Sequence, residues 1–251
     1  MNPLISVIIP AFNEENRLGL TLEKVLTYFD HRRTPVEIVV VDDDSTDATS
    51  EVAGAFRRDH QLGDRMQIHR SRPNRGKGFS VKRGMQAAGG SFALMTDADL
   101  STPIEEVEKL EREVVHGTHD LAFGSRDVQG SVVAIRQSWF RENSGKIFNR
   151  FVRLATGLPF RDTQCGFKLF DMSRCRPLFA AQTVYGFGFD VELLYVARKW
   201  GLSMKEVPVV WRHAPGSKVR FATDAPRMLL DLFRIRLNDL RGRYDRDKVT
   251  R

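Results

Sequence analysis

Short apolar runs alternate, in the N-terminal part of the chain, with segments whose apolar side chains recur at helical spacing. The runs are rich in β-branched residues and continuous rather than alternating in polarity. That pattern is typical of parallel strands buried on both faces, and its alternation with helices predicts an α/β fold. The predicted strands are residues 5–9, 37–41, 66–69 and 92–96, with helices through 18–29, through 52–56 and up to residue 88.

Polar residues follow the end of each predicted strand. Asn13 comes after the first strand, where it is also expected to cap the next helix. Asp42–Ser45, Asn74–Lys77 and Asp97 follow the other three strands. In parallel sheets, ligands bind beyond the carboxyl ends of the strands. We therefore expect these loops to converge on one edge of the sheet and to form the binding site there.

Two carboxylates, Asp97 and Asp99, follow the fourth strand and are separated only by Ala98. Positions i and i+2 of a strand point to the same side, so a bend after Asp97 would aim both carboxylates at one cation. Carboxylates suit Mg²⁺ or Mn²⁺, which proteins hold with one or two such groups and substrate phosphates. The alternative is a pair of solvated carboxylates capping the helix that begins near Pro103.

Basic residues occupy two kinds of position in the second half of the chain. A predicted helix at 105–115 and strand at 121–123 lead to Arg126, where a guanidinium suits phosphate binding; a surface salt bridge is the alternative. From 136 to 154, basic and aromatic residues interleave on a predicted helix. This interleaving fits a membrane surface or, equally, an amphipathic helix packed on the sheet.

A last helix is predicted over residues 226–243. Its expected apolar and polar faces comprise, respectively, Met228, Leu229, Leu232, Phe233 and Leu240, and Arg227, Asp231, Arg234, Asn238 and Arg241. A basic amphipathic helix is suited to the membrane surface, and packing on the catalytic domain is the alternative.

Composition narrows the classes of protein. Hydrophobic residues make up 41% and charged residues 28% of 251 residues, as in ordinary globular domains. Of the net charge of +7, residues 212–251 carry most, with eleven lysines and arginines against five aspartates. No apolar stretch approaches the roughly 20 residues that span a bilayer. Two cysteines without zinc spacing predict reduced thiols and a cytoplasmic protein.

Several functions are disfavoured by missing motifs. The chain has no Gly-x-Gly-x-x-Gly after its first strand, and Gly76-Lys77-Gly78 lacks the spacing of a P-loop. A nucleic-acid-binding domain fits the pI of about 9.6, but no nucleic-acid motif is present, and we expect no nucleic-acid partner. A nucleotidyltransferase would also use paired carboxylates, yet it needs a glycine-rich basic first loop that Pro10–Glu14 does not supply.

The motifs together resemble glycosyltransferase family 2. The resemblance is carried by Ser6–Glu14, Val41–Ser45, Asp162–Phe170, Gly188–Leu194 and Gly216–Lys218. The last three look specific to the branch that acts on polyprenyl phosphates, the dolichyl-phosphate glucosyltransferases and their relatives, the dolichyl-phosphate mannose synthases. The resemblance implies a GT-A fold with a Rossmann-like, mostly parallel sheet. It also implies a catalytic domain over 1–222, with a nucleotide half (1–126) and an acceptor half (127–222), followed by a basic helix and tail over 223–251.

Site residues can be transferred through these motifs. The resemblance implies that the nucleotide-sugar is bound by Pro10, Phe12, Glu14, Val41, Asp43, Lys77, Asp97 and Ala98, with Asp43 reading the base. Asp97 and Asp99 would hold the metal. The acceptor phosphate would be bound by Arg126, Arg136, Arg212 and Lys218. The residues implied in catalysis are Asp97, Asp99, Arg126, Asp162 and Asp190. Ser101 stands where mannose synthases often carry a glutamine ligand, so metal ligation is expected to differ.

The implied reaction is inverting transfer of glucose from UDP-glucose to a polyprenyl phosphate at the inner face of the membrane, with Mg²⁺ or Mn²⁺. GDP-mannose as donor, or a saccharide as acceptor, remain alternatives. A phosphate acceptor is already anionic near neutral pH and needs no strong base. We therefore expect Asp162 and Asp190 to organise the pocket; pairing with Lys168 or Arg161 is the purely structural alternative. With a hydroxyl acceptor, one of the two would become the base.

Overall fold

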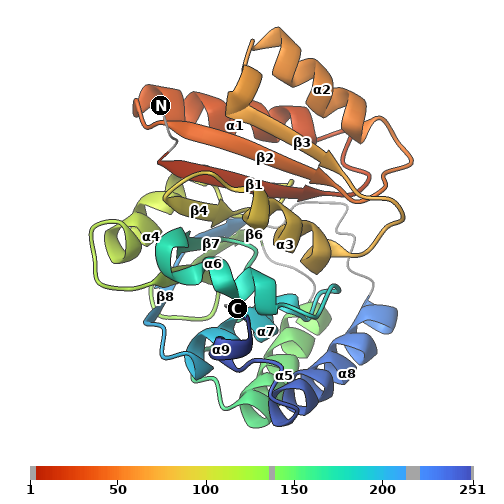
Figure 1. The fold of residues 1–251 in the computed structure, drawn as a ribbon, viewed down its shortest axis with the longest axis vertical. Helices are drawn as coiled ribbons and strands as arrows, with labels where there is room; N and C mark the ends of the chain where they lie inside the picture. Colours follow the sequence, from red (N-terminus) through yellow and green to blue (C-terminus); the bar gives the residue numbers. More distant parts are fainter. Residues whose placement is uncertain (1–3, 136–138, 213–220, 250–251) are drawn as a thin grey trace.

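The computed structural model describes residues 4–135, 139–212 and 221–249. Its centre is a seven-stranded sheet with the order β3-β2-β1-β4-β7-β5-β8 (Figure 1). The strands are β1 (Ile5–Ala11), β2 (Val36–Asp42), β3 (Met66–Arg70), β4 (Phe92–Met95), β5 (Leu121–Ser125), β7 (Lys168–Asp171) and β8 (Met204–Pro208). A separate pair joins β6 (Val132–Ile135) to β9 (Val210–Arg212) in parallel.

The first four strands are parallel, as the sequence predicts, and their register aligns the polar segments at one edge. Pro10 pairs with Val41, and Ala11 with Asp42, so the first two strands end level with each other. The strand β7 departs from the expected pattern because it runs antiparallel to both β4 and β5. This reversal carries the segment before Lys168 back to the edge where Asp97 lies.

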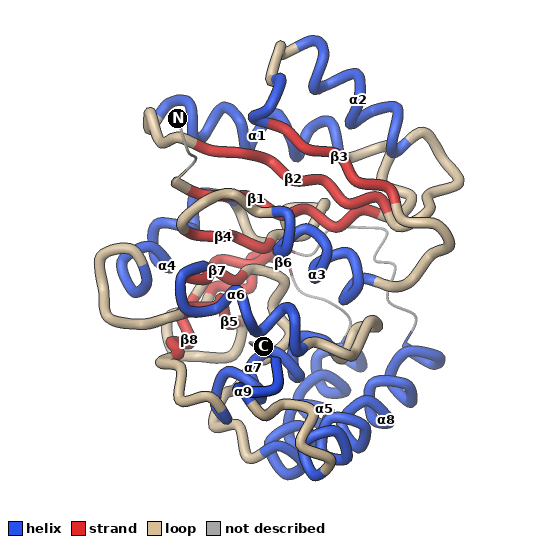
Figure 2. The backbone as a smooth tube through the Cα atoms, in the orientation of Figure 1, coloured by secondary structure: helices blue, strands red, loops and turns tan. Residues whose placement is uncertain are grey.

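Helices cover both faces of the sheet (Figures 1 and 2). Their bounds are α1 (Leu18–His31), α2 (Thr49–Asp59), α3 (Lys77–Ala87), α4 (Val107–Val114), α5 (Trp139–Thr156), α6 (Met172–Ala181), α7 (Phe189–Lys199), α8 (Phe221–Leu240) and α9 (Arg246–Val249), with 3-10 turns η1 (Gly63–Arg65) and η2 (Ile104–Glu106). Alternate strand residues supply two cores. Val7 and Val40 pack with α1, α2 and α4, while Ile8 and Val41 pack with α3. Both faces are therefore buried, which explains the continuous apolar runs.

The structure corrects two local predictions. Asn13 is not a helix cap: its φ is +55°, and α1 begins at Leu18. Asn13 instead joins two loops, since its backbone N–H donates to Ser45 and its side chain accepts from the backbone of Thr46. An asparagine side chain can either cap a helix or connect two loops, and its residue type alone does not tell which of the two it does.

The predicted faces of the last helix are also wrong. Met228 and Leu232 are buried against the body of the protein, whereas Phe233 and Leu240 are exposed. Asn238, expected on the polar face, is buried and donates to Thr183 and Tyr244. A buried polar network thus replaces part of the expected apolar face. In the described ranges, no helix combines the length and apolar character needed to cross a membrane.

Candidate functional site

The loop after β2 is held to the loop before α3 through Asp43. Both oxygens of its buried carboxylate accept backbone N–H groups, from Arg75 at 2.9 Å and from Gly76 at 2.7 Å. Asn74 donates its side-chain amide to the Asp43 carbonyl at 2.8 Å. Asp43 therefore organises this loop; the sequence-based role of reading a base stays a prediction.

Other residues expected around the nucleotide lie at the same edge of the sheet but differ in how far they are exposed to solvent. Pro10 ends up buried in β1, Phe12 is exposed, and Glu14 pairs with Arg17 across 2.5 Å. The Val41 side chain is fully buried and faces Gly84 of α3, so it does not line an open surface. The reason is its position in β2, where alternate residues point into the core.

Asp97 and Asp99 follow β4, as predicted, and both lie beside cations. Asp97 Oδ1 is 2.5 Å from Lys77 Nζ at the first turn of α3, and Asp99 Oδ2 is 4.0 Å from Arg17 Nη1. Asp99 Oδ1 accepts the backbone N–H of Ser101 at 2.9 Å. Burial opposes the charge of Lys77, but the carboxylates of Asp97 and Asp190 outweigh it and raise the pKa of Lys77.

Gly166 lets the segment before β7 approach Asp97 closely. A Cβ at this position would lie 2.1 Å from Asp97 Oδ2, a separation that no real contact allows. A glycine is therefore needed for this segment to reach the turn that carries Asp97.

The second ion pair joins Asp162 to Arg126. Arg126 donates Nε to Oδ2 at 2.6 Å and Nη2 to Oδ1 at 2.8 Å, and its backbone N–H also reaches Oδ2. Burial favours the neutral form of Asp162, but the charge and hydrogen bonds of Arg126 prevail and lower the pKa of Asp162. The main partner of Asp162 is therefore Arg126, and not Lys168 or Arg161, the two residues that the sequence suggested as a structural alternative. The Arg126 guanidinium also lies 5.6 Å from the Trp211 ring centroid.

The third pair, Asp190 and Lys168, is buried. Lys168 Nζ lies 2.6 Å from Asp190 Oδ1 and donates to the Cys165 carbonyl at 2.6 Å. Burial raises the pKa of Asp190 against the opposing charges of Lys168 and Lys77. This pairing is one that the sequence left open as a structural alternative. The burial of Lys168 was harder to predict than that of Asp190, because nothing in the sequence distinguishes Lys168 from an ordinary residue of a strand.

The carboxylates suit a divalent cation that also takes ligands from a substrate. Among the described residues, no three histidine, cysteine or acidic side chains gather as a metal site. Asp97 and Asp99 supply hard oxygen ligands. Each of these carboxylates lies beside a cation, Lys77 or Arg17, which balances its negative charge. A Mg²⁺ or Mn²⁺ ion held by one or two carboxylates and by phosphates fits this donor set.

Comparisons with known proteins bear on the family of the chain. A sequence profile for Glycosyl transferase family 2 matches residues 6–175. Dolichyl-phosphate beta-glucosyltransferase of Drosophila melanogaster is 38% identical over 251 residues, covering 96% of this chain and 76% of that protein. The human protein of the same name is 36% identical over 255 residues, covering 96% and 77%. The chain belongs to glycosyltransferase family 2.

Solved structures place this family 2 glycosyltransferase in the GT-A fold. Glucosyl-3-phosphoglycerate synthase from Mycobacterium tuberculosis, solved with Mn²⁺, UDP and glucosyl-3-phosphoglycerate, matches with a TM-score of 0.68 at 20% identity, over 94% of this chain and 79% of that one. The mannosyltransferase PcManGT from Pyrobaculum calidifontis, in complex with GDP-Man and Mn²⁺, matches with a TM-score of 0.62 at 18% identity, over 95% and 65%.

Of the residues expected to bind the acceptor phosphate in this glycosyltransferase, Arg212 can be placed beside the carboxylates. Its backbone N–H donates to the Ser101 carbonyl at 2.7 Å, and its side chain is exposed. This contact brings β9 to the loop that follows Asp99. Arg136 and Lys218 lie outside the described residues.

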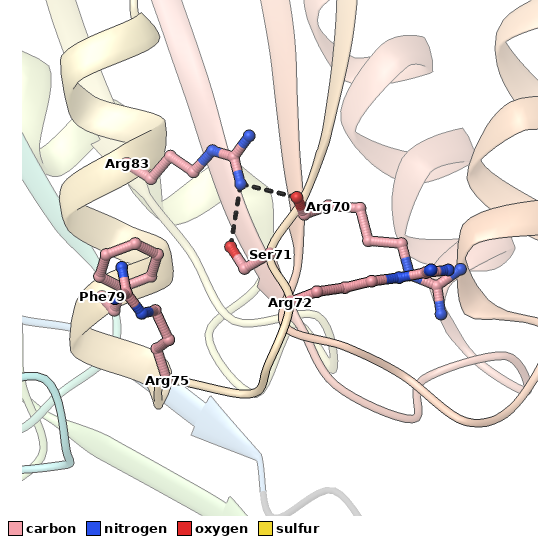
Figure 3. A pocket seen from close by; sticks show the side chains of 6 residues that line it. All are labelled: Arg70, Ser71, Arg72, Arg75, Phe79 and Arg83. Atoms are coloured by element: carbon pink, nitrogen blue, oxygen red, sulfur yellow. Dashed lines mark hydrogen bonds between the residues drawn. The ribbon is translucent and has the colours of Figure 1, made fainter.

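Sequence reasoning missed a basic hollow of about 540 Å³ at the end of β3 (Figure 3). It is lined by Arg70, Ser71, Arg72, Arg75, Phe79 and Arg83. Arg75 lies over the Phe79 ring at 4.5 Å, and its backbone is the one that binds Asp43. The close spacing of Arg70, Arg72 and Arg75 in the sequence was the available signal. Two of these arginines lie near carboxylates that follow β2 or end it, Arg70 at 3.6 Å from Asp42 and Arg72 at 3.9 Å from Asp44.

Proposed function

We propose that this glycosyltransferase transfers glucose from UDP-glucose to a polyprenyl phosphate, with inversion at the anomeric carbon. The names of its relatives support both the sugar and the lipid phosphate, since they are dolichyl-phosphate beta-glucosyltransferases of 32–38% identity. An α-linked nucleotide donor then gives a β-linked lipid product in one displacement.

The observation that carries the proposal is the pairing of the inner carboxylates. Asp162 is bound by Arg126 and Asp190 by Lys168, each across 2.6 Å. A sugar hydroxyl would need a general base to remove its proton during attack. A phosphate monoester has its second pKa near 6 and attacks as an anion without one. Against the effect of burial, Arg126 lowers the pKa of Asp162 and makes this carboxylate a weak base, which favours a phosphate over a saccharide acceptor.

The nucleotide diphosphate is expected to lie over Asp97, Asp99 and Lys77. Asp97 and Asp99 would hold the divalent ion, which would neutralise charge on the departing diphosphate. Lys77 is poised at the first turn of α3, 2.5 Å from Asp97, where it can hold a phosphate oxygen instead. The backbone bonds to Asp43 fix the loop that carries Lys77, so this cation is positioned before the substrate arrives.

The acceptor phosphate is expected on the Arg126 and Arg212 side. Asp162 orients the Arg126 guanidinium through two parallel hydrogen bonds, and β9 holds Arg212 next to Ser101. Donor and acceptor phosphates repel one another, so the work of these residues is positioning and charge neutralisation.

A panel of donors and acceptors tests the proposal. The purified enzyme is incubated with UDP-glucose or GDP-mannose, Mg²⁺ or Mn²⁺, and a short-chain polyprenyl phosphate, the matching polyprenol or a free saccharide. We expect a glycolipid only from UDP-glucose with polyprenyl phosphate, and none after chelation of the metal. Transfer only from GDP-mannose would overturn the donor assignment. Hydrolysis without lipid product, or transfer to the saccharide, would overturn the acceptor assignment.

A further inference from the structure

The helix α8 carries an apolar stripe on the side that faces away from the protein. Leu230, Phe233, Leu237 and Leu240 are 67%, 74%, 45% and 81% exposed. Their spacing of three, four and three residues places them on one face of a helix. Single exposed apolar residues are common on protein surfaces, but a continuous exposed stripe of large side chains is not.

The opposite side of α8 already supplies the packing that the fold needs. Leu232 and Ile235 are buried in the core shared with α7, and Asn238 joins the buried network with Thr183 and Tyr244. The four residues of the outer stripe lie outside this core. Because these side chains are large and apolar, we expect another apolar surface to cover them.

The neighbouring helix α5 also carries exposed apolar side chains. The two helices run side by side at one end of the molecule (Figures 1 and 2). Phe151 and Leu154 of α5 are 51% and 83% exposed. We call these two residues and the four of α8 the apolar stripe.

Arginines border the apolar stripe, and their positive charge indicates that the partner surface is negatively charged. Arg227, Arg234 and Arg241 are exposed and recur every seven residues along one side of the stripe, and α5 adds exposed Arg150 and Arg153. Two carboxylates on α8 contact other parts of the protein, and the charge of Arg234 also acts on Asp231. Asp231 lies against Gly188 of the loop before α7, and Asp239 binds Lys199 and Tyr195.

We propose that the apolar stripe docks on a bilayer containing anionic lipids, with its side chains among the acyl chains and the bordering arginines at the headgroup phosphates. Apolar burial and headgroup attraction together are the two contributions that hold interfacial helices on membranes. A second copy of the chain would present the same positive charges, whereas anionic headgroups complement them.

The docked helix lies next to the acceptor side of the catalytic site. A Cβ on Gly188 would lie 2.7 Å from Asp231 Oδ2, so α8 rests directly on the start of α7. Asp190 follows in the first turn of α7. Docking through the apolar stripe would thus bring the bilayer to the end of the molecule next to α7, with the acceptor phosphate itself expected at Arg126 and Arg212; this consequence rests on the proposed function.

Vesicle flotation with the full chain tests the docking. Uncharged phosphatidylcholine vesicles are compared with vesicles that also contain phosphatidylglycerol, at low and high salt. The triple variant Leu230→Ser/Phe233→Ser/Leu240→Ser removes apolar area, and Arg227→Gln/Arg234→Gln/Arg241→Gln removes charge. Leu20→Ser is the matched control, since Leu20 is 61% exposed on α1. Circular dichroism confirms that each variant is folded.

We expect the parent and Leu20→Ser to float with anionic vesicles, more weakly at high salt. The apolar triple should bind at least about tenfold more weakly, which corresponds to losing roughly two buried methylene groups. The arginine triple should lose the preference for anionic lipid. Absence of flotation at low salt, or equal binding by all variants, would overturn the proposal. So would a dimer in sedimentation that the apolar triple dissociates.

Activity distinguishes this inference from the proposed function. Both triples should keep the parent's turnover on a water-soluble, short-chain polyprenyl phosphate, because their side chains lie outside the charged site. If the parent floats but does not glucosylate that acceptor, the proposed function fails and the docking stands. If the parent glucosylates it but does not float, the docking fails alone.

Discussion

Ion pairs organise the catalytic edge at the scale of single residues. Lys77 holds Asp97, Arg126 holds Asp162 and Lys168 holds Asp190, at 2.5, 2.6 and 2.6 Å. Each carboxylate is thereby oriented by a cation. The pair at Asp97 is the most exposed of the three and is the one that a bound metal and diphosphate would rearrange.

Replacing Asp99 tests the metal assignment. Asp99→Asn keeps the size of the side chain but removes its charge. We expect transfer to fall about 100-fold, since losing roughly 3 kcal/mol of charge stabilisation has that effect on a rate. Mn²⁺ binding, followed by electron paramagnetic resonance, should weaken in parallel.

Asp59→Asn, at the exposed end of α2, is the control for Asp99→Asn and should leave both measurements unchanged. Unaltered Mn²⁺ affinity in Asp99→Asn would show that this carboxylate is not a metal ligand.

Replacing Asp190 tests the buried pair. Asp190→Asn leaves the fully buried Lys168 without its counter-charge, and removing one partner of such a pair costs about 3–5 kcal/mol of unfolding free energy. The double variant Lys168→Met/Asp190→Leu removes both charges and should recover most of that loss. Chemical denaturation measures all three proteins.

Equal stability of Asp190→Asn and the parent would contradict the structural importance of the pair. If Asp190→Asn also kept donor binding while losing nearly all turnover, Asp190 would be a base rather than an organiser of the pocket.

The candidate carboxylates were predictable from sequence, whereas of their partners only Lys168 was named, as one structural alternative. Asp97 and Asp99 follow an apolar run directly. This local pattern indicates the end of a strand and does not depend on the rest of the fold. Arg126 and Asp162 are 36 residues apart and meet only because β5 and β7 lie side by side. Pairings of this kind depend on strand order, which the hydrophobic pattern does not specify.

At the scale of elements, glycines allow α3 and the loop before α7 to meet. Gly76 has a φ of +100°, and a Cβ there would lie 2.5 Å from the Tyr185 carbonyl oxygen. A Cβ on Gly78 would lie 2.7 Å from both Phe189 Cβ and the Val184 carbonyl oxygen. This close approach sets the start of α3, and with it the position of Lys77.

Gly78→Ala should therefore separate the two segments. Overpacking of this kind costs about 1–3 kcal/mol of stability, and we expect UDP-glucose to bind more weakly in calorimetry because Lys77 moves with α3. Gly54→Ala in α2 is the matched control: its Cβ would meet only the end of Arg58 at 3.5 Å. That variant should be as stable as the parent or slightly more so, since alanine favours helices. Equal donor affinity in the two variants would contradict the role of this contact.

Most elements followed from local pattern, and the exceptions have physical reasons. The strands β1 to β4 and the helices between them lie where periodicity predicts them, because both faces of the sheet are buried. The faces of α8 were assigned wrongly because this helix is apolar on two sides. A hydrophobic pattern counts apolar residues but does not say which of two apolar sides packs inward.

At the scale of the whole molecule, the sheet brings residues from distant parts of the chain to one edge. The parallel strands β1 to β3 and the turn after β4 bring together Asp43, Lys77, Asp97 and Asp99, and the antiparallel β7 adds Lys168. The sequence predicts the first group through the rule for parallel strand ends. The reversal of β7 and the pairing of β6 with β9 were not predictable, because short strands far apart in sequence carry no signal of direction.

Charge and apolar surface are segregated on this scale as well. The C-terminal excess of positive charge noted in the sequence becomes, in part, the arginine border of the apolar stripe on α5 and α8. The helix α8 carries the stripe on its outer side and rests on the start of α7 through Asp231. An enzyme that joins a water-soluble sugar nucleotide to a lipid phosphate requires both surfaces.

The most direct test of the account is the anomeric configuration of the product. The enzyme is supplied with UDP-glucose, Mn²⁺ and a short-chain polyprenyl phosphate, and the purified glycolipid is examined by proton NMR. We predict a single polyprenyl phosphate glucose with the β configuration. An α-linked product, or release of free glucose with no glycolipid, would contradict the account.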